Sequence, residues 1–146
     1  MTRVVLLDSG PLSMVAHPRR HPEIKSWLQQ LLRAGVDVRV PEIADYEVRR
    51  ELLHLGAQRS IERLDVLKKL GYVPLSTPMM LRAADLWAEA RRVGQPTADA
   101  KALDGDVILA AQALVLCEQG LDVVVATTNV GHLTRFCRAS HWQQTA

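Results

Sequence analysis

Val4-Val5-Leu6-Leu7-Asp8-Ser9-Gly10-Pro11 places an uninterrupted apolar run directly before a carboxylate and three residues typical of a turn. Four consecutive apolar residues fit a strand that is covered on both faces, as in a parallel sheet. Ligands of open parallel sheets bind outside the carboxyl ends of the strands. We therefore expect Asp8 to lie at a sheet edge where a binding site forms, with residues 9–11 as a turn.

Two further segments bring polar groups toward the same edge. Val123-Val124-Val125-Ala126 is a second apolar run, and it ends in Thr127-Thr128-Asn129. Asp104-Gly105-Asp106 precedes a segment that is apolar nearly all round, which predicts a buried helix from Asp106 to about residue 118. The free N–H groups and partial positive charge of a helix N-terminus keep nearby carboxylates ionised. Carboxylates that meet at one rim indicate a divalent-metal site.

The rest of the chain alternates between helical and extended patterns. Helices are predicted over residues 22–34, 42–55, 60–70, 77–93 and 129–136, and strands over 36–40, 71–75, 121–126 and 141–143, with a loop over 95–103. Strands that alternate with helices predict an α/β fold, here a three-layer α/β/α sandwich with a mainly parallel central sheet.

Length and composition place this sandwich among single soluble domains. The chain has 146 residues, of which 48% are apolar and 23% charged, so residues 1–146 are expected to form one domain. The most apolar window, residues 107–117, is far shorter than the roughly 20 residues of a membrane span. Asp8 interrupts any signal-peptide pattern, and we expect a cytoplasmic protein. A net charge of +2 is too small to indicate nucleic-acid binding by itself.

Several of the polar residues also have a purely structural explanation. Asp8 could cap the turn that follows it. Asp104 could be a helix N-cap and Asp106 an acid of the first turn, although capping explains one aspartate better than two. Capping of the helix over residues 129–136 equally explains Thr127-Thr128-Asn129. Pattern alone leaves these alternatives open.

Glu47 is not singled out by periodicity. On a helical wheel it groups with Arg50, Glu51 and His54, which together form a charged face that is normally solvated. The significance of Glu47 comes from a resemblance.

Four segments, in this order along the chain, resemble the motifs of PIN-domain nucleases, a family that includes the VapC-like toxins of bacterial toxin–antitoxin pairs. The segments are residues 5–12 (VLLDSGPL), 41–52 (PEIADYEVRREL), 103–113 (LDGDVILAAQA) and 126–133 (ATTNVGHL). Asp8, Glu47 and Asp106 occupy the acidic positions of the first three motifs. Each motif alone is weak, whereas four at sensible spacings are fairly specific.

The resemblance implies an Mg²⁺- or Mn²⁺-dependent endoribonuclease that hydrolyses single-stranded RNA. Mg²⁺ is usually held by one or two carboxylates together with waters and phosphate oxygens. The residues implied are Asp8, Glu47 and Asp106 for catalysis, Asp8, Asp106 and Asp104 for the metal, Thr128 and Asn129 in support, and Arg49, Arg50 and Lys101 for contacts with RNA. Glu47 would act as a ligand or through a water. Many relatives carry aspartate where this chain has Asn129, which can coordinate through its oxygen but contributes no charge.

The same resemblance implies three partners: an RNA substrate, a small antitoxin protein that blocks the acidic rim, and a second copy in a homodimer. The short apolar windows described above predict no membrane partner. The alternative within the fold is a non-catalytic PIN-like protein that binds RNA or acts as a scaffold. A phosphatase of another α/β class would need a second aspartate at position 10, which is Gly10. A nucleotide-binding module is disfavoured because neither G-x-G-x-x-G nor a G-K-[ST] loop is present.

Overall fold

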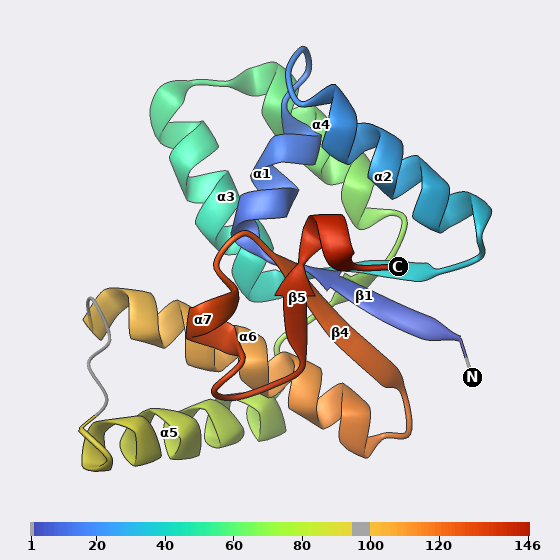
Figure 1. The fold of residues 1–146 in the computed structure, drawn as a ribbon. Coiled ribbons are helices and arrows are strands. Elements are labelled where there is room, and N and C mark those ends of the chain that lie inside the picture. Colours follow the sequence, from blue (N-terminus) through green and yellow to red (C-terminus); the bar gives the residue numbers. More distant parts are fainter. Residues whose placement is uncertain (1, 95–99) are drawn as a thin grey trace.

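The computed structural model describes residues 2–94 and 100–146, apart from the side chains of residues 100–102 (Figure 1). Strands and helices alternate along most of this length. The elements are β1 (Arg3–Leu7), α1 (Ser9–Ala16), α2 (Pro22–Arg33), β2 (Asp37–Pro41), α3 (Glu42–Leu55), α4 (Gln58–Lys68), β3 (Tyr72–Val73), α5 (Thr77–Arg92), α6 (Ala100–Glu118), β4 (Asp122–Thr127), α7 (Val130–Leu133), β5 (Ala139–His141) and a 3₁₀ turn (Trp142–Gln144).

The five strands form one sheet in the order β3-β2-β1-β4-β5, and every pairing is parallel. The apolar strand β1 is central: Val5 pairs with Val38 of β2 on one side and with Val124 of β4 on the other. Its last residue, Leu7, pairs with Ala126 near the end of β4. The carboxyl ends of β1 and β4 therefore lie side by side, and the prediction that they reach the same edge of the sheet is confirmed.

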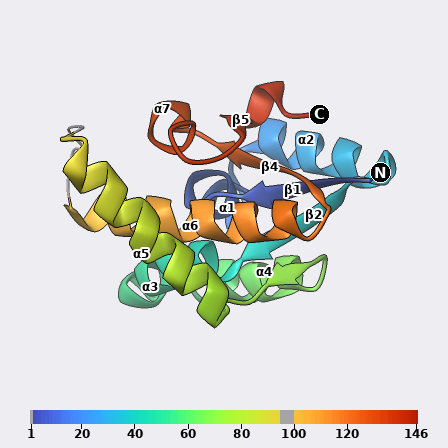
Figure 2. The same ribbon diagram turned by 90° about the horizontal axis from the view of Figure 1, so that it is seen from below.

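Alternate residues of β1 face two separate layers of helices. Val5 and Leu7 pack in a cluster with α1, α2, α3 and α4, whereas Val4 and Leu6 pack in a cluster with α5 and α6. Figure 1 shows the first group of helices above the sheet and α5 and α6 below it, and Figure 2 shows α5 crossing α6. The predicted three-layer α/β/α sandwich is confirmed. Among the helices described, none has the length and apolarity needed to cross a membrane.

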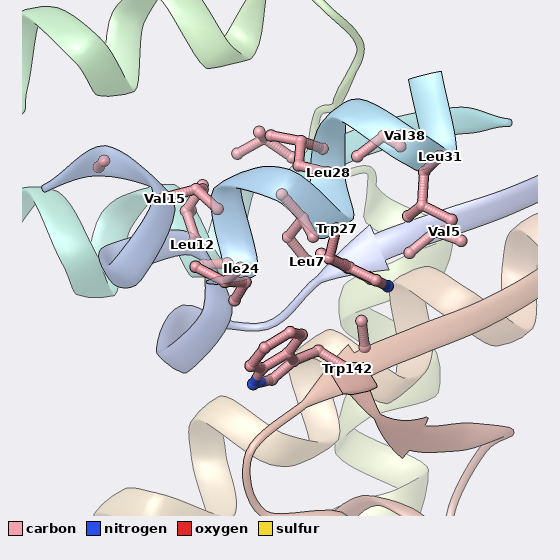
Figure 3. Close-up of a cluster of buried hydrophobic side chains, with 14 of the residues drawn as sticks. Val5, Leu7, Leu12, Val15, Ile24, Trp27, Leu28, Leu31, Val38 and Trp142 are labelled. Atoms are coloured by element: carbon pink, nitrogen blue, oxygen red, sulfur yellow. The ribbon is translucent and has the colours of Figure 1, made fainter. Parts of the chain in front are cut away.

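The C-terminal segment closes the first cluster over α2. The ring of Trp142 meets the ring of Trp27 edge to face, with 5.7 Å between centroids, and Figure 3 shows both rings beside Ile24 and Leu7. The indole N–H of Trp27 donates to the carbonyl of Thr145 at 2.8 Å, and Thr145 is itself buried. This contact fastens the last residues of the chain to α2.

Three local expectations were wrong. Residues 9–11 do not form a turn, because α1 begins at Ser9 with Asp8 as its N-cap. The helix predicted to start at Ser60 begins at Gln58, so Ser60 is a buried residue inside α4. The last strand ends at His141, and Trp142–Gln144 form a 3₁₀ turn.

The loop expected over residues 95–103 is wrong for its last four positions, because α6 begins at Ala100; residues 95–99 lie outside the description. Asp104 and Asp106 are therefore inside the helix rather than at its N-terminus. The argument that a helix N-terminus keeps them ionised, and the alternative that Asp104 is the helix cap, both fail for this reason.

Candidate active site

Asp8 is held at the carboxyl end of β1 by two hydrogen bonds. Its Oδ1 accepts from the backbone N–H of Ser9 at 2.7 Å, which caps α1. Its Oδ2 accepts from the hydroxyl of Thr127 at 2.7 Å, and Thr127 is fully buried at the end of β4. Asp8 therefore both acts as a cap and lies at the edge of the sheet, so the two explanations considered for it from the sequence are compatible.

Glu47 projects from α3 toward α6. A Cβ atom built on Gly105 would lie only 2.7 Å from Oε2 of Glu47, so the glycine leaves the space that this carboxylate fills. Burial raises the pKa of Glu47, and the negative charges of Asp8 and Asp106 raise it as well, while Arg50 lowers it. Glu47 therefore lies in the electrostatic field of both other acids.

Asp106 belongs to the same acidic group. Burial raises its pKa above the ordinary value, and the charge of Asp8 raises it further, while His132 and Arg135 lower it. The Nδ1 atom of His132 lies 3.6 Å from Oδ2 of Asp106. Asp8, Glu47 and Asp106 are named the acidic cluster below. Asp8 follows β1, Glu47 lies on α3 and Asp106 on α6, and the charge of Asp8 raises the pKa of the other two.

Thr128 and Asn129 follow β4 on the exposed side of this cluster. A Cβ atom on Gly10 would lie 2.6 Å from Oγ1 of Thr128, so the first turn of α1 comes close to that side chain. The backbone N–H of Asn129 donates to Oγ1 of Thr127 at 2.9 Å. The amide nitrogen of Asn129 and Nδ1 of His132 are 3.2 Å apart and share a hydrogen bond. A series of hydrogen bonds therefore runs from Asp8 through Thr127 and Asn129 to His132, which lies beside Asp106.

Asp104 lies apart from the acidic cluster. Two positions separate it from Asp106, which places the two on different sides of α6 because successive helical residues are rotated by about 100°. Asp104 is exposed and lines an apolar groove of about 400 Å³ between α5 and α6, beside Trp87 and Ile108. It is not among the charges that shift the pKa of Glu47 or Asp106. The structure gives no support to Asp104 as a metal ligand.

The three cations expected to contact RNA have different surroundings. Arg49 faces α4, where its guanidinium binds Asp45 at 2.9 Å and Asp65 at 2.7 Å, and these carboxylates raise its pKa. Because two carboxylates already bind this guanidinium, we do not propose Arg49 as a contact for RNA phosphate. Arg50 is exposed and acts electrostatically on Glu47. The side chain of Lys101 lies outside the described residues.

A groove of about 540 Å³ leads away from the acidic cluster between α1 and α3. Glu47 and Arg50 line one part of it, Ser9 and Ser13 line the α1 side, and other lining residues include His17 and His21. Hydroxyl, imidazole and guanidinium groups can all donate hydrogen bonds to phosphate oxygens. The groove thus offers donors beside two carboxylates, Glu47 and Glu51, which also line it.

The donor chemistry of the acidic cluster fits a hard divalent cation. Its groups are carboxylates, and burial together with the charge of Asp8 disfavours the ionised forms of Glu47 and Asp106, an effect that a bound cation would reverse. Within residues 2–94 and 100–146, no three His, Cys, Asp or Glu side chains are placed so that they alone could hold a metal ion. Mg²⁺ does not need three, because it usually keeps several waters and binds one or two carboxylates and phosphate oxygens.

Sequence reasoning missed two residues of this site. Thr127 was not separated from its neighbours, although its burial and its bond to Asp8 distinguish it from Thr128. His132 lies within the fourth motif, but no role is predicted for it from the sequence, yet it is the residue that contacts both Asp106 and Asn129. The available signal for His132 was its place three residues after Asn129, on the same side of a short helix.

No family model and no curated protein sequence matches the chain. Several solved structures share its fold. A chain of VapBC2 from Rickettsia felis, crystallised with a DNA fragment from the promoter of VapBC2, superposes with a TM-score of 0.75 at 14% identity, covering 95% of this chain and 98% of that one. VapBC-1 from nontypeable Haemophilus influenzae gives a TM-score of 0.68 at 17% identity, and FitAcB from Neisseria gonorrhoeae gives 0.63 at 21%, each covering 97% of this chain and 99% of the other. At these identities, the similarity concerns the fold, and it extends over nearly the whole of each chain.

Proposed function

We propose that the protein is a metal-dependent endoribonuclease that hydrolyses single-stranded RNA at the acidic cluster. The observation that carries the proposal is the meeting of three carboxylates, Asp8 after β1, Glu47 on α3 and Asp106 on α6: the charge of Asp8 raises the pKa of both Glu47 and Asp106. A protein that needed these acids only for stability would gain nothing from repulsion among them. Clusters of carboxylates with perturbed pKa values are typical of functional sites.

Asp8 and Asp106 are the proposed ligands of Mg²⁺ or Mn²⁺, and Glu47 is a further ligand or contacts a water beside the ion. When bound, such an ion activates water at neutral pH and offsets the negative charge of the phosphoryl transition state. The protein supplies the geometry: Thr127 fixes one carboxylate oxygen of Asp8, and Gly105 leaves room for Glu47. Thr128 and Asn129 are proposed to orient the scissile phosphate, and Arg50 to contact it.

We further propose that the chain is the toxin of a toxin–antitoxin pair. The sequence resembles VapC-like toxins, and the structures that share its fold are VapBC and FitAcB complexes. A small antitoxin would inhibit the enzyme by covering the acidic cluster. Homodimerisation and a cytoplasmic location are proposed on the same basis.

The proposal is tested by incubating the purified protein with a mixed pool of single-stranded RNA and mapping the products by sequencing. We expect internal cleavage in Mg²⁺ or Mn²⁺ and none in excess EDTA. Absence of cleavage with both metals contradicts the endoribonuclease. If the protein binds the RNA but leaves it intact, the non-catalytic PIN-like alternative is favoured instead.

The Gly105→Ala variant is expected to separate catalysis from stability. The new Cβ lies 2.7 Å from Oε2 of Glu47 and must displace that carboxylate. Displacement by about 1 Å can cost up to about 10²-fold in rate, while alanine in a helix interior stabilises by about 0.5–1 kcal/mol relative to glycine. We expect cleavage to slow at least tenfold with no loss in melting temperature. Gly131→Ala is the control, because its Cβ meets nothing within 4 Å; equal cleavage by the two variants would rule out this role of Gly105.

The Asp106→Asn variant is expected to melt at a higher temperature than the wild type in EDTA at pH 7. Because the pKa of Asp106 is raised in the folded state, the stability associated with its protonated form is present at low pH and lost as the pH rises through the folded pKa. Asparagine removes this penalty, so a gain of about 1 kcal/mol, or about 3–5 °C, is expected at pH 7 and should shrink near pH 4.

The same melting experiment also reports on the metal. Mg²⁺ should raise the melting temperature of the wild type, because a ligand that binds only the folded state stabilises it. It should have much less effect on Asp106→Asn. A lower melting temperature for the variant in EDTA would contradict this prediction, because it would show that the ionised Asp106 carboxylate stabilises the fold.

A further inference from the structure

A group of basic side chains lies at the junction of α1 and α2, where the groove between α1 and α3 reaches His17 and His21. We name it the basic corner, and it consists of His17, Arg20, His21, Lys25 and Arg63. His17 caps the end of α1, His21 precedes α2, and Arg63 comes from α4. The groove that begins beside Glu47 thus ends at a concentration of positive charge.

Neighbouring positive charges disfavour the protonated forms of two members of the basic corner. The pKa of His17 is lowered by burial and by the charges of Arg20, His21, Lys25 and Arg63, and the pKa of Lys25 is lowered by burial and by Arg63. Acidic side chains are close, since Glu62 lines the surface beside Arg63 and Glu23 lies in the first turn of α2. Yet among the ion pairs of the described residues, none joins a carboxylate to the basic corner.

The backbone holds the corner in a costly shape. Outside glycine, His21 is the only described residue with a positive φ, at 62°, a left-handed conformation that is unfavourable for any residue with a Cβ. Nδ1 of His17 accepts from the backbone N–H groups of Arg19 and Arg20, at 3.2 and 3.1 Å. The two imidazole rings pack edge to face, 5.9 Å apart. Strain of this kind persists where the surrounding structure supports it and is concentrated at functional sites.

We propose that the basic corner binds phosphates of the RNA strand that flank the scissile phosphate, so that the strand runs from the acidic cluster along the α1–α3 groove to the junction of α1 and α2. The inference rests on the proposed endoribonuclease function. Asp8 and His17 stand at opposite ends of α1, about 13 Å apart at a rise of about 1.5 Å per residue. A positively charged groove that tracks the backbone is the usual device for binding single strands of several nucleotides without sequence preference.

The test compares two variants that lose the same charge. The corner variant carries Arg20→Gln, Lys25→Gln and Arg63→Gln, and the control carries Arg33→Gln, Lys69→Gln and Arg92→Gln, three exposed cations elsewhere. Binding of a labelled 12-nucleotide RNA is measured by fluorescence anisotropy in EDTA over a range of salt concentrations. We expect the corner variant to bind about 10–30-fold more weakly at low salt, with a salt slope smaller by about 2, because each phosphate contact with a single strand contributes about 0.7. The control should change neither.

A cleavage arm in Mg²⁺ adds the ratio of kcat/KM for the 12-nucleotide RNA to that for a trinucleotide. This ratio should fall about tenfold in the corner variant and stay constant in the control. Circular dichroism checks folding, since Arg63 also donates to the carbonyl of Val15. Equal affinity and salt slope in the two variants, or no binding by the wild type, would overturn the basic corner as an RNA site. Absence of cleavage by the wild type would instead overturn the endoribonuclease, leaving the binding comparison to decide the corner.

Discussion

Replacing Asp8 with asparagine is expected to reduce metal-dependent RNA cleavage by about 10²–10⁴-fold while the protein stays folded. A metal ion contributes several kcal/mol of charge stabilisation in the transition state, and each 1.4 kcal/mol corresponds to a factor of ten in rate. Asparagine removes the negative charge that the ion needs. It keeps the shape and one oxygen, which can still cap α1 or accept from Thr127. The rate is measured with the same RNA pool in Mg²⁺, and the fold by the melting temperature.

The matched control for this variant is Asp85→Asn, which removes an exposed carboxylate from α5. It should leave both the rate and the melting temperature unchanged. If the Asp8→Asn variant cleaved RNA at the rate of the control, the proposal that Asp8 is a metal ligand would be contradicted. Asp8→Asn that loses its cooperative melting transition would show that Asp8 is needed chiefly for the cap and the bond to Thr127.

Replacing Trp142 with alanine is expected to lower the free energy of unfolding by about 3–5 kcal/mol, the usual cost of removing a large buried aromatic side chain. Only 7% of Trp142 is exposed, and its ring packs against Trp27 over the cluster that contains Leu7 and Ile24. The substitution leaves a cavity and loosens the segment whose Thr145 carbonyl accepts from Trp27. The change is measured by urea unfolding followed by far-ultraviolet circular dichroism.

Trp87→Ala is the control for size and residue type. Trp87 is 37% exposed, lines the groove between α5 and α6 and contacts Arg91. Its removal should cost well under half as much as that of Trp142. If the two variants were equally stable, the packing of Trp142 on Trp27 would not contribute to the stability of the core.

The layers of the fold could be predicted because they depend on long apolar runs. The runs at Val4–Leu7 and Val123–Ala126 have no polar alternation, and strands of this kind must be covered on both faces. The strand order could not be predicted in this way, and the pairing of Leu7 with Ala126 is known only from the structure. The position of Asp8 at the sheet edge could be predicted, since it depends only on where the first strand ends.

Helix boundaries next to glycine could not be predicted, because tertiary contacts decide them. Ser9-Gly10-Pro11 resembles a turn, but proline is tolerated in the first turn of a helix, where its missing N–H has no partner to lose. Gly105 resembles a helix start, but it lies inside α6. Its lack of a side chain leaves room for the carboxylate of Glu47. Because Glu47 is 58 positions earlier in the sequence, no local pattern can predict this contact.

The roles of Glu47 and His132 in the candidate site could not be predicted from local sequence patterns either. Periodicity places Glu47 on a charged helix face, and only the resemblance to PIN domains singled it out. The structure explains why: α3 packs against both α1 and α6, so a face that would be solvated in an isolated helix is covered at Glu47. The contact of His132 with Asp106 depends in turn on the approach of α7 to α6, which no sequence spacing encodes.

Strand β1 is made first on the ribosome, but its neighbour β4 is made much later. Asp8 and its hydrogen-bond partner Thr127 are 119 positions apart. At a synthesis rate of about 5–20 residues per second, about 6–24 s pass between the two on the ribosome. Contacts of such long range also close slowly. If the acidic cluster cleaves RNA, a growing chain has no complete active centre until β4 emerges, and this delay protects the message from which the enzyme is being translated.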